Sequence, residues 1–286
     1  MKEKLRSFAC WLGDLLKTDP SLRRHLGNIG YEDVGDVHRD SIFYHEGFEP
    51  HRFSAVELSN LGPHDPEWQH VWGVLRNDLK ELIIWECDEA VQSVRLLDID
   101  GVGASKSRGP WKSVEEFGRS YGCEHIPRTT ESDFAANVGH SFPHSKAPFD
   151  FWHAWWNRRM YWMNDDGSHH AASAYVQARE QGLEFSIPSR VTRLRIDVIR
   201  ARRITNRFHA FVVENRTADA LFHVLWPFAV PYQSARYAPA GERLTLLFFP
   251  RRSRRASFAA KTIQEFGSPR AVYDFVEFLK TSMAEP

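Results

Sequence analysis

Long runs of apolar residues are missing from this chain of 286 residues. No stretch approaches the roughly 18 consecutive apolar residues that a membrane-spanning helix needs. The N-terminal segment also lacks the apolar core and small-residue cleavage site of a secretory signal. Cysteine is scarce as well. Cys10, Cys87 and Cys123 are isolated and without C-x-x-C spacing, which argues against a disulfide framework and a zinc ribbon. We therefore expect a cytoplasmic protein with no membrane partner.

Two common catalytic signatures are absent too. The chain has neither the G-x-S-x-G turn of serine hydrolases nor the G-K-[ST] ending of a Walker phosphate loop. The composition is that of a globular protein, with 42% hydrophobic and 26% charged residues, so one large domain or two modest ones are expected.

The net charge of zero conceals an uneven distribution. Residues 1–185 carry 20 Lys/Arg against 29 Asp/Glu, whereas residues 186–257 carry 14 against 4. Such a split indicates a basic face for an acidic partner, nucleic acid or nucleotide. Equally, the acidic residues 1–185 and the basic residues 186–257 could neutralise each other within the molecule.

The densest polar chemistry lies in the segment "YWMNDDGSHHAASAYVQAREQG" at residues 161–182. Residues 159–163 have the pattern of a strand, an acidic turn follows, and an alanine-rich helix begins near Ser168 and stops at Gly182. A helix N-terminus offers free backbone N–H groups and the positive end of the helix dipole. Gly167 would allow close approach, and the neighbouring hydroxyl and imidazole groups could contact a phosphate.

This segment, with "GLEFSIPSRVTRLRI" after it, resembles the nucleotide-binding turn of the ParB/sulfiredoxin superfamily. Members often show a strand, a D-G-x-H-R or G-x-x-R turn, an alanine-rich helix and a hydrophobic-Pro step into a strand. Asp166, Gly167 and His169 match, and the resemblance covers residues 162–196 closely and about 94–200 more loosely. His170 stands where the pattern usually has arginine. Ser168 stands where sulfiredoxins carry their catalytic cysteine, so sulfinic-acid reduction is not expected.

We expect an α+β fold in three parts. The resemblance implies a mixed ParB/sulfiredoxin-like core at residues 94–200, and the residue patterns predict a helical N-terminal region at 1–93 and a basic, β-rich C-terminal region at 201–286 with a terminal helix. The resemblance also implies binding of ATP, ADP or CTP, with Mg²⁺, or use of the same cleft on DNA. In that case the phosphate would contact the residues Gly167, Ser168, His169 and His170. Any chemistry would use Asp165 or Asp166 as metal ligand or base, with His169 at the phosphate.

Seven arginines lie between Arg190 and Arg207, and "RRSRR" at residues 251–255 adds a second cluster. If residues 191–199 form a strand, Arg193 and Arg195 share one face of it. Nucleic-acid contact is therefore predicted for Arg193, Arg195, Arg202 and Arg203. A solvated face is the equal alternative for this cluster, and an exposed loop is expected at 251–255.

Several alternatives stay open. The turn could be purely structural, with Asp165 or Ser168 capping the helix. His140, His144 and His153 could form a metal site, although their spacing gives weak support and no metal ligand is assigned. The loop after residue 98, with Asp98, Asp100, Lys106 and Arg108, could be a second phosphate contact, although a solvated turn is favoured. The function itself has two alternatives: a catalytically inactive interaction protein, such as an inhibitor or adaptor with a protein partner, or a metal-dependent nuclease.

Overall fold

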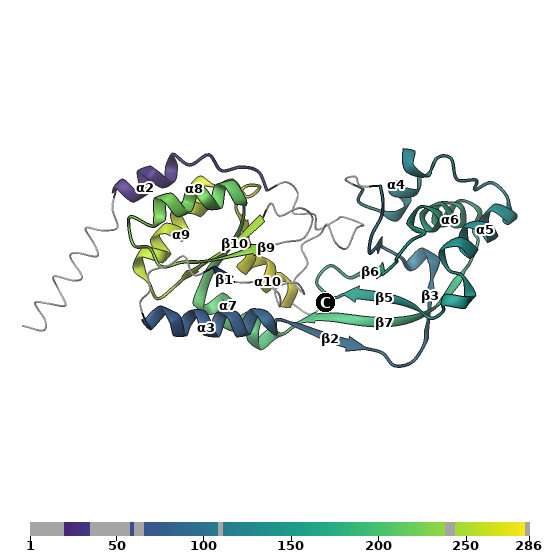
Figure 1. Ribbon diagram of the computed structural model, residues 1–286, viewed down its shortest axis with the longest axis horizontal. Coiled ribbons are helices and arrows are strands. Elements are labelled where there is room, and N and C mark those ends of the chain that lie inside the picture. Colours follow the sequence, from purple (N-terminus) through teal and green to yellow (C-terminus); the bar gives the residue numbers. More distant parts are fainter. Residues whose placement is uncertain (1–19, 35–57, 60–65, 108–110, 238–243, 284–286) are drawn as a thin grey trace, which may run out of the picture. The chain divides into compact units, whose positions relative to one another are not determined.

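The computed structural model describes residues 20–34, 58–59, 66–107, 111–237 and 244–283 (Figure 1). The chain forms two compact units, which interleave along the sequence. Unit 2 contains Ile83–Ile196, and unit 1 contains Met1–Val37 and Pro50–Leu82 together with Asp197–Pro286. Both units combine helices with β-sheet, which confirms the α+β class.

Unit 1 has a five-stranded sheet in the order β1-β9-β10-β8-β11 with helices on both faces (Figure 1). Helices α2, α8 and α9 cover one face, where Phe211 and Phe249 are buried, and α3, α7 and α10 cover the other, where Phe208 and Phe248 are buried. Because both faces are covered, the central strands are apolar along nearly their whole length. The elements are α2 (Pro20–Gly27), β1 (Leu58–Ser59), α3 (Pro66–Lys80), α7 (Val198–Arg207), β8 (Phe208–Glu214), α8 (Asn215–Leu225), β9 (Gln233–Tyr237), β10 (Leu244–Pro250), α9 (Arg254–Phe266), β11 (Tyr273–Asp274) and α10 (Phe275–Met283).

Unit 2 has a mixed sheet in the order β2-β7-β5-β6-β4, with β3 paired to β7. Helices α4, α5 and α6 pack together, and the buried alanines of α6 meet the strands in one apolar core (Figure 1). The elements are β2 (Ile83–Cys87), β3 (Gln92–Arg95), η3 (Leu96–Asp98), β4 (Gly101–Val102), α4 (Val114–Gly118), η4 (Tyr121–Cys123), α5 (Glu131–Ser141), η5 (His144–Lys146), β5 (Phe149–Ala154), β6 (Arg159–Trp162), α6 (Ser168–Gln181) and β7 (Ser186–Ile196).

The structure divides the chain differently from the three-part prediction. The compact core begins at Ile83 rather than residue 94 and ends at Ile196 rather than residue 200, because β2 pairs with β7 along its whole length. The N- and C-terminal regions lie in one unit, since β1 pairs with β9 and helices α2 and α3 pack against α9 and α7. The C-terminal region is mixed rather than β-rich, and its predicted terminal helix is confirmed as α10.

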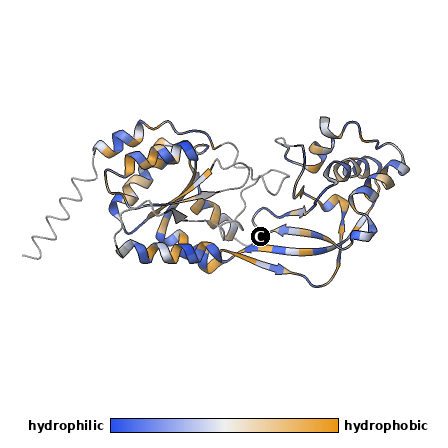
Figure 2. Ribbon diagram, in the orientation of Figure 1, coloured by the Kyte–Doolittle hydropathy of each residue, from blue (hydrophilic) through white to orange (hydrophobic). Residues whose placement is uncertain are grey.

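Two local predictions fail for identifiable reasons. Weak periodicity and many Pro, His, Ser and Gly residues predict a long loop at residues 123–150. The structure instead has α5 there, which starts with a capping box between Thr130 and Asp133. The supposed strand over residues 191–199 ends at Ile196, because the Asp197 side chain accepts hydrogen bonds from two following N–H groups and starts α7. Figure 2 shows the hydrophilic and hydrophobic residues alternating along the helices, as amphipathic helices require.

No helix among the described residues is long and apolar enough to cross a bilayer. The spacing of Leu5, Phe8, Leu12 and Leu15 predicts an amphipathic helix over residues 4–17, and this segment lies outside the described residues.

Candidate functional site

The predicted turn joins β6 to α6 and is fixed in place by α5. Gly167 has φ +77°, in the left-handed region that favours glycine. A Cβ there would lie 3.1 Å from the Cα of Ser141, so the close approach of the two segments also requires glycine. The Ser141 hydroxyl donates a hydrogen bond to the Gly167 carbonyl at 2.9 Å. The chain conformation at the turn is therefore set by its neighbour as well as by its own sequence.

Helix α6 begins without a side-chain cap. Gly167 is the N-cap residue, and no side chain accepts from the first-turn N–H groups, so the alternative of capping by Asp165 or Ser168 is wrong. The first backbone bond within the helix joins the Ala171 N–H to the Gly167 carbonyl at 2.9 Å. The N–H groups before Ala171 therefore lack intrahelical acceptors, and they carry the positive end of the dipole of a 14-residue helix.

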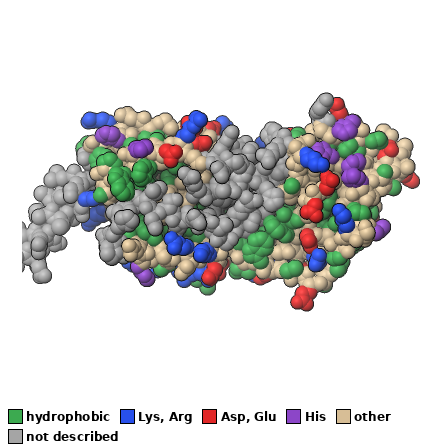
Figure 3. Space-filling model, viewed as in Figure 1, with side chains coloured by type: hydrophobic (Ala, Val, Ile, Leu, Met, Phe, Trp, Pro, Cys, Tyr) green, Lys and Arg blue, Asp and Glu red, His purple; other side chains and the backbone are tan. Residues whose placement is uncertain are grey.

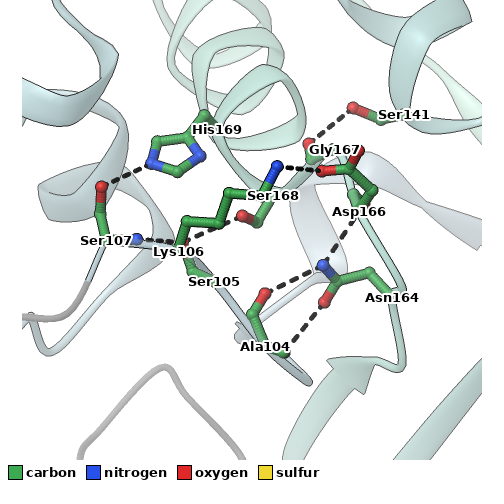
Figure 4. A network of polar contacts seen from close by, with 10 residues as sticks. All are labelled: Ala104, Ser105, Lys106, Ser107, Ser141, Asn164, Asp166, Gly167, Ser168 and His169. Atoms are coloured by element: carbon green, nitrogen blue, oxygen red, sulfur yellow. Dashed lines mark hydrogen bonds and ion pairs between the residues drawn. The ribbon is translucent and has the colours of Figure 1, made fainter.

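A second loop, residues 103–107 after β4, lies against this helix start because β4 runs parallel to β6 (Figure 4). The Asn164 side chain bonds both backbone groups of Ala104, at 3.2 and 2.9 Å. The Ser168 hydroxyl donates to the Ser105 hydroxyl at 3.1 Å. Together these bonds place two serines and one lysine of the loop beside the N-terminus of α6.

Lys106 reaches across Ser168 to Asp166, with 3.9 Å between the ammonium and the carboxylate (Figure 4). The pKa of Asp166 is lowered, first by the hydrogen bond from the Gly167 N–H and then by the charge of Lys106. Asp166 is therefore ionised at neutral pH. Because both side chains are mostly exposed, their pair is weak and a competing anion could take Lys106 from it.

His169 lies between the loop and α4. Its Nε2 is 2.8 Å from the Ser107 hydroxyl, and its ring contacts Phe117 at 5.2 Å between centroids. Burial lowers its pKa most, and the nearby charges of His125 and Lys106 lower it further. The imidazole is therefore neutral at pH 7, and it can exchange a proton with a hydroxyl at hydrogen-bond distance.

His170 points to α5 rather than into the same loop. Its Nδ1 is 2.8 Å from Oδ1 of Asn137, whose amide nitrogen donates to the Pro127 carbonyl. Since that oxygen can only accept, Nδ1 carries the proton, and in the neutral ring Nε2 is left as an acceptor. The ring packs 4.0 Å from that of His140. Burial, then His140 and His169, lower the pKa of His170, so the ring is neutral at pH 7.

The predicted phosphate residues Gly167, Ser168, His169 and His170 thus lie at one helix end, with Asp166 beside them. Asp165 is exposed in the same turn. Figure 3 shows histidine side chains gathered on the face of unit 2 that carries α4 to α6. The sequence did not reveal Asn137 and Ser141, because only the tertiary structure brings these residues to the turn. Asn164 lies in the turn itself, but its bonds to Ala104 also depend on the tertiary structure. Lys106 was considered and disfavoured. The other residues of that possible second phosphate contact are engaged elsewhere or not described. Asp98 pairs with Arg95, Asp100 accepts a hydrogen bond from the Met160 N–H, and Arg108 lies outside the described residues.

The predicted nucleic-acid contacts are mostly engaged with carboxylates. Arg193 pairs with Asp88 at 2.9 Å, and Arg195 forms a two-point pair with Glu86. The cause is strand pairing, since Arg193 lies directly opposite Glu86 when β2 joins β7.

The other two predicted contacts, Arg202 and Arg203, lie on α7 in unit 1. Arg203 is bound to the buried Asp78 at 2.7 Å, whereas Arg202 is exposed. Three of the four predicted contacts therefore have their charge balanced within the protein.

The possible metal site of His140, His144 and His153 is not supported by a preformed cluster of ligands. Across the parts of the chain that the structure describes, no group of three or more His, Cys, Asp or Glu side chains could hold a metal ion. His140 lies in α5 and packs on His170, while His153 lies in β5.

Comparison with known families gives one match. Residues 90–285 fit a family described as "Family of unknown function (DUF6685)", and this span is more than half of the chain. The chain belongs to this family. The DUF6685 span includes the turn, α6 and the whole of unit 1 from Asp197 to α10. No curated protein and no solved structure matches the chain.

Proposed function

We propose that unit 2 is a ParB/sulfiredoxin-like nucleotide-binding unit that holds a phosphate group at the start of α6. The observation that carries the proposal is the uncapped N-terminus of α6, which lies beside Ser105, Lys106 and Ser107 of a second loop. Backbone N–H groups, hydroxyls and one lysine are the groups that proteins use to bind phosphate. The candidate ligands are ATP, ADP and CTP, with Mg²⁺.

The roles of the side chains follow from their positions. A phosphate at the helix start would draw Lys106 away from Asp166, and His169 would contact it through the imidazole edge that now meets Ser107. Asp165 and Asp166, exposed at the turn, would hold the Mg²⁺ that accompanies a nucleotide.

Calorimetric titration with ATP, ADP and CTP, with and without Mg²⁺, tests the proposal. The wild-type protein should bind at least one of them, and His169→Ala should remove most of that binding because the histidine both contacts the ligand and positions the Ser107 loop. His144→Ala is a matched control, since that histidine is exposed in η5 of the same unit. A wild-type protein that binds none of the three nucleotides would refute the proposal.

A second experiment concerns His170, which occupies the position of the usual arginine. An arginine donates to phosphate at any pH and with two N–H groups, whereas neutral His170 offers no donor from Nε2. Nucleotide affinity of the wild type should therefore rise as the pH falls from about 8 to about 5.5 and His170 gains a proton.

The His170→Arg variant should bind about tenfold more tightly at pH 8, in line with the strength of a charge-assisted hydrogen bond, and should lose the part of the pH dependence that His170 contributes. Titrations of both proteins at the two pH values measure this. Equal affinity of the two proteins at pH 8 would show that position 170 does not face the phosphate.

The alternative of an inactive interaction protein is favoured by one observation, the neutral His170 bound to Asn137 where an arginine is expected. On that hypothesis the nucleotide titrations fail and a stoichiometric protein partner co-purifies with the chain. The two hypotheses therefore predict opposite results in the same calorimeter.

A further inference from the structure

Two arginine-bearing segments of unit 1 that lie far apart in the sequence, the end of α7 and the turn before α9, contact each other. The turn between β10 and α9 packs against the end of α7, where the Arg251 N–H donates to the Arg207 carbonyl at 2.8 Å. The Arg251 guanidinium also donates from Nε to the carbonyls of Thr205 and Phe208, at 3.1 and 2.9 Å. These bonds hold the turn in one position. The basic surface formed at this junction comprises Arg207, Arg251, Arg252, Arg254 and Lys261.

The cations of this basic surface have few carboxylates near them. Asp78 interacts electrostatically with Arg207 without a direct ion pair, and Asp274 lies near His209. Residues 251–264 contain no Asp or Glu. Within the described part of the chain, no carboxylate forms an ion pair with Arg207, Arg252 or Arg254, and all three side chains are exposed. This differs from Arg193, Arg195 and Arg203, which have carboxylate partners.

The lowered pKa of His209 on β8 is further evidence of positive potential in this region. The pKa of His209 is lowered to about 4, first by burial and then by the charges of Arg251 and Lys261, which outweigh the opposing charge of Asp274. Both cations therefore act within the same region of unit 1. Lys261 lies seven residues after Arg254 on α9, which places the two on one face of that helix.

The start of α9 adds to the positive potential. The Ser253 hydroxyl accepts from the Ala256 N–H at 3.2 Å, and the first turn contains Arg254 and Arg255 but no acidic residue. Helix N-termini favour anions and disfavour cations, so arginines here are placed against the usual electrostatic preference. An external anion in front of the turn would be stabilised by the helix and the arginines together.

We propose that this basic surface binds the phosphodiester backbone of nucleic acid. Guanidinium groups match the geometry of phosphate oxygens, and the exposed amide of Asn206 offers further donors at the same junction. A protein interface would be expected to have an apolar centre. The exposed large apolar side chains of unit 1 lie elsewhere on its helices, at Val198, Ile199, Trp226 and Phe266.

This inference does not depend on the nucleotide proposal, because the surface lies in unit 1 and the helix start of α6 lies in unit 2. Loss of nucleotide binding in His169→Ala and loss of nucleic-acid binding in an α9 variant are therefore separate results.

The test compares two double variants by fluorescence anisotropy with short labelled DNA duplexes, single-stranded DNA and RNA. Arg252→Gln/Arg254→Gln removes two charges from the basic surface, and Arg24→Gln/Arg76→Gln removes two exposed charges from α2 and α3 of the same unit. At about 100 mM salt, the first variant should bind duplex DNA at least about tenfold more weakly than the wild type, and the control should bind like it.

The salt dependence gives a second measurement. Between about 50 and 200 mM salt, the slope of log affinity against log salt should be shallower by nearly two for the first variant, about 0.9 for each lost phosphate contact. Circular dichroism confirms that both variants are folded. Equal losses in both variants, absence of binding to every nucleic acid, or binding of the wild type to polyglutamate but to no nucleic acid would each overturn the proposal.

Discussion

Replacing Gly118 with alanine should lower the free energy of unfolding by about 3 kcal/mol, the upper end of the usual cost of overpacking a core. The reason is the contact between α4 and α6. A Cβ on Gly118 would lie 2.4 Å from the Ala172 carbonyl oxygen and 2.7 Å from a Val176 methyl group. One of the two helices would have to move, since a backbone carbonyl cannot turn away as a flexible side chain can.

The matched control is Gly139→Ala in α5 of the same unit, where an added Cβ meets nothing within 4 Å. This change should raise stability by about 0.5 to 1 kcal/mol, because alanine favours the helix over glycine. Urea unfolding followed by circular dichroism measures both variants. If Gly118→Ala were as stable as the wild type, the tight packing of α4 on α6 would be wrong.

The Gly118 result also bears on the candidate site. Phe117, the residue before it, is fully buried and touches the ring of His169. A displaced α4 would therefore move the support behind the imidazole. We expect any folded Gly118→Ala protein to bind nucleotide more weakly than Gly139→Ala does, in the titration described above.

Acidification from pH 7 to about 4.5 should cost the protein about 1 to 2 kcal/mol of stability through His209. The usual value of about 1.4 kcal/mol for each unit of pKa shift is reduced here by solvent screening, because the side chain is only half-buried. The pKa of this histidine is about 4 in the folded protein, against 6.5 ordinarily, because burial and the cations Arg251 and Lys261 oppose its protonation. At a pH between these two pKa values, His209 is protonated in the unfolded chain but not in the folded protein. The contribution is thus present above pH 6.5 and lost as the pH falls towards 4.

His209→Gln isolates this contribution, since glutamine does not titrate. Urea unfolding of both proteins at pH 7 and at about pH 4.5 gives the comparison: the wild type should lose about 1 to 2 kcal/mol more than the variant on acidification. Other groups that titrate in this range cancel between the two proteins. An identical loss in both would mean that His209 titrates near its ordinary pKa in the folded state.

Local sequence signals predicted the turn and its helix well. The pair of glycines Gly167 and Gly182 marks both ends of α6, and each adopts the left-handed conformation there. The same local reasoning failed for α7, because its arginines and β-branched residues suit a strand as well as a helix. Only the cap from Asp197 and the packing of α7 against α3 and α10 decide between them. Helix α5 was missed because its apolar periodicity is weak, although Thr130 and Asp133 did carry a capping signal.

By itself, the sequence determined the helix start with its free N–H groups, since glycine placement and alanine content act within a few residues. Which charges are free for a partner was decided by the tertiary structure. Pairing of β2 with β7 neutralises Arg193 and Arg195, whereas the contact between Arg207 and Arg251 brings together arginines that form no direct ion pair with a described carboxylate. The state of His170 was likewise set by Asn137, 33 residues away in the chain. Electrostatic interactions act through space, so the distribution of available charge depends on which segments the fold brings together.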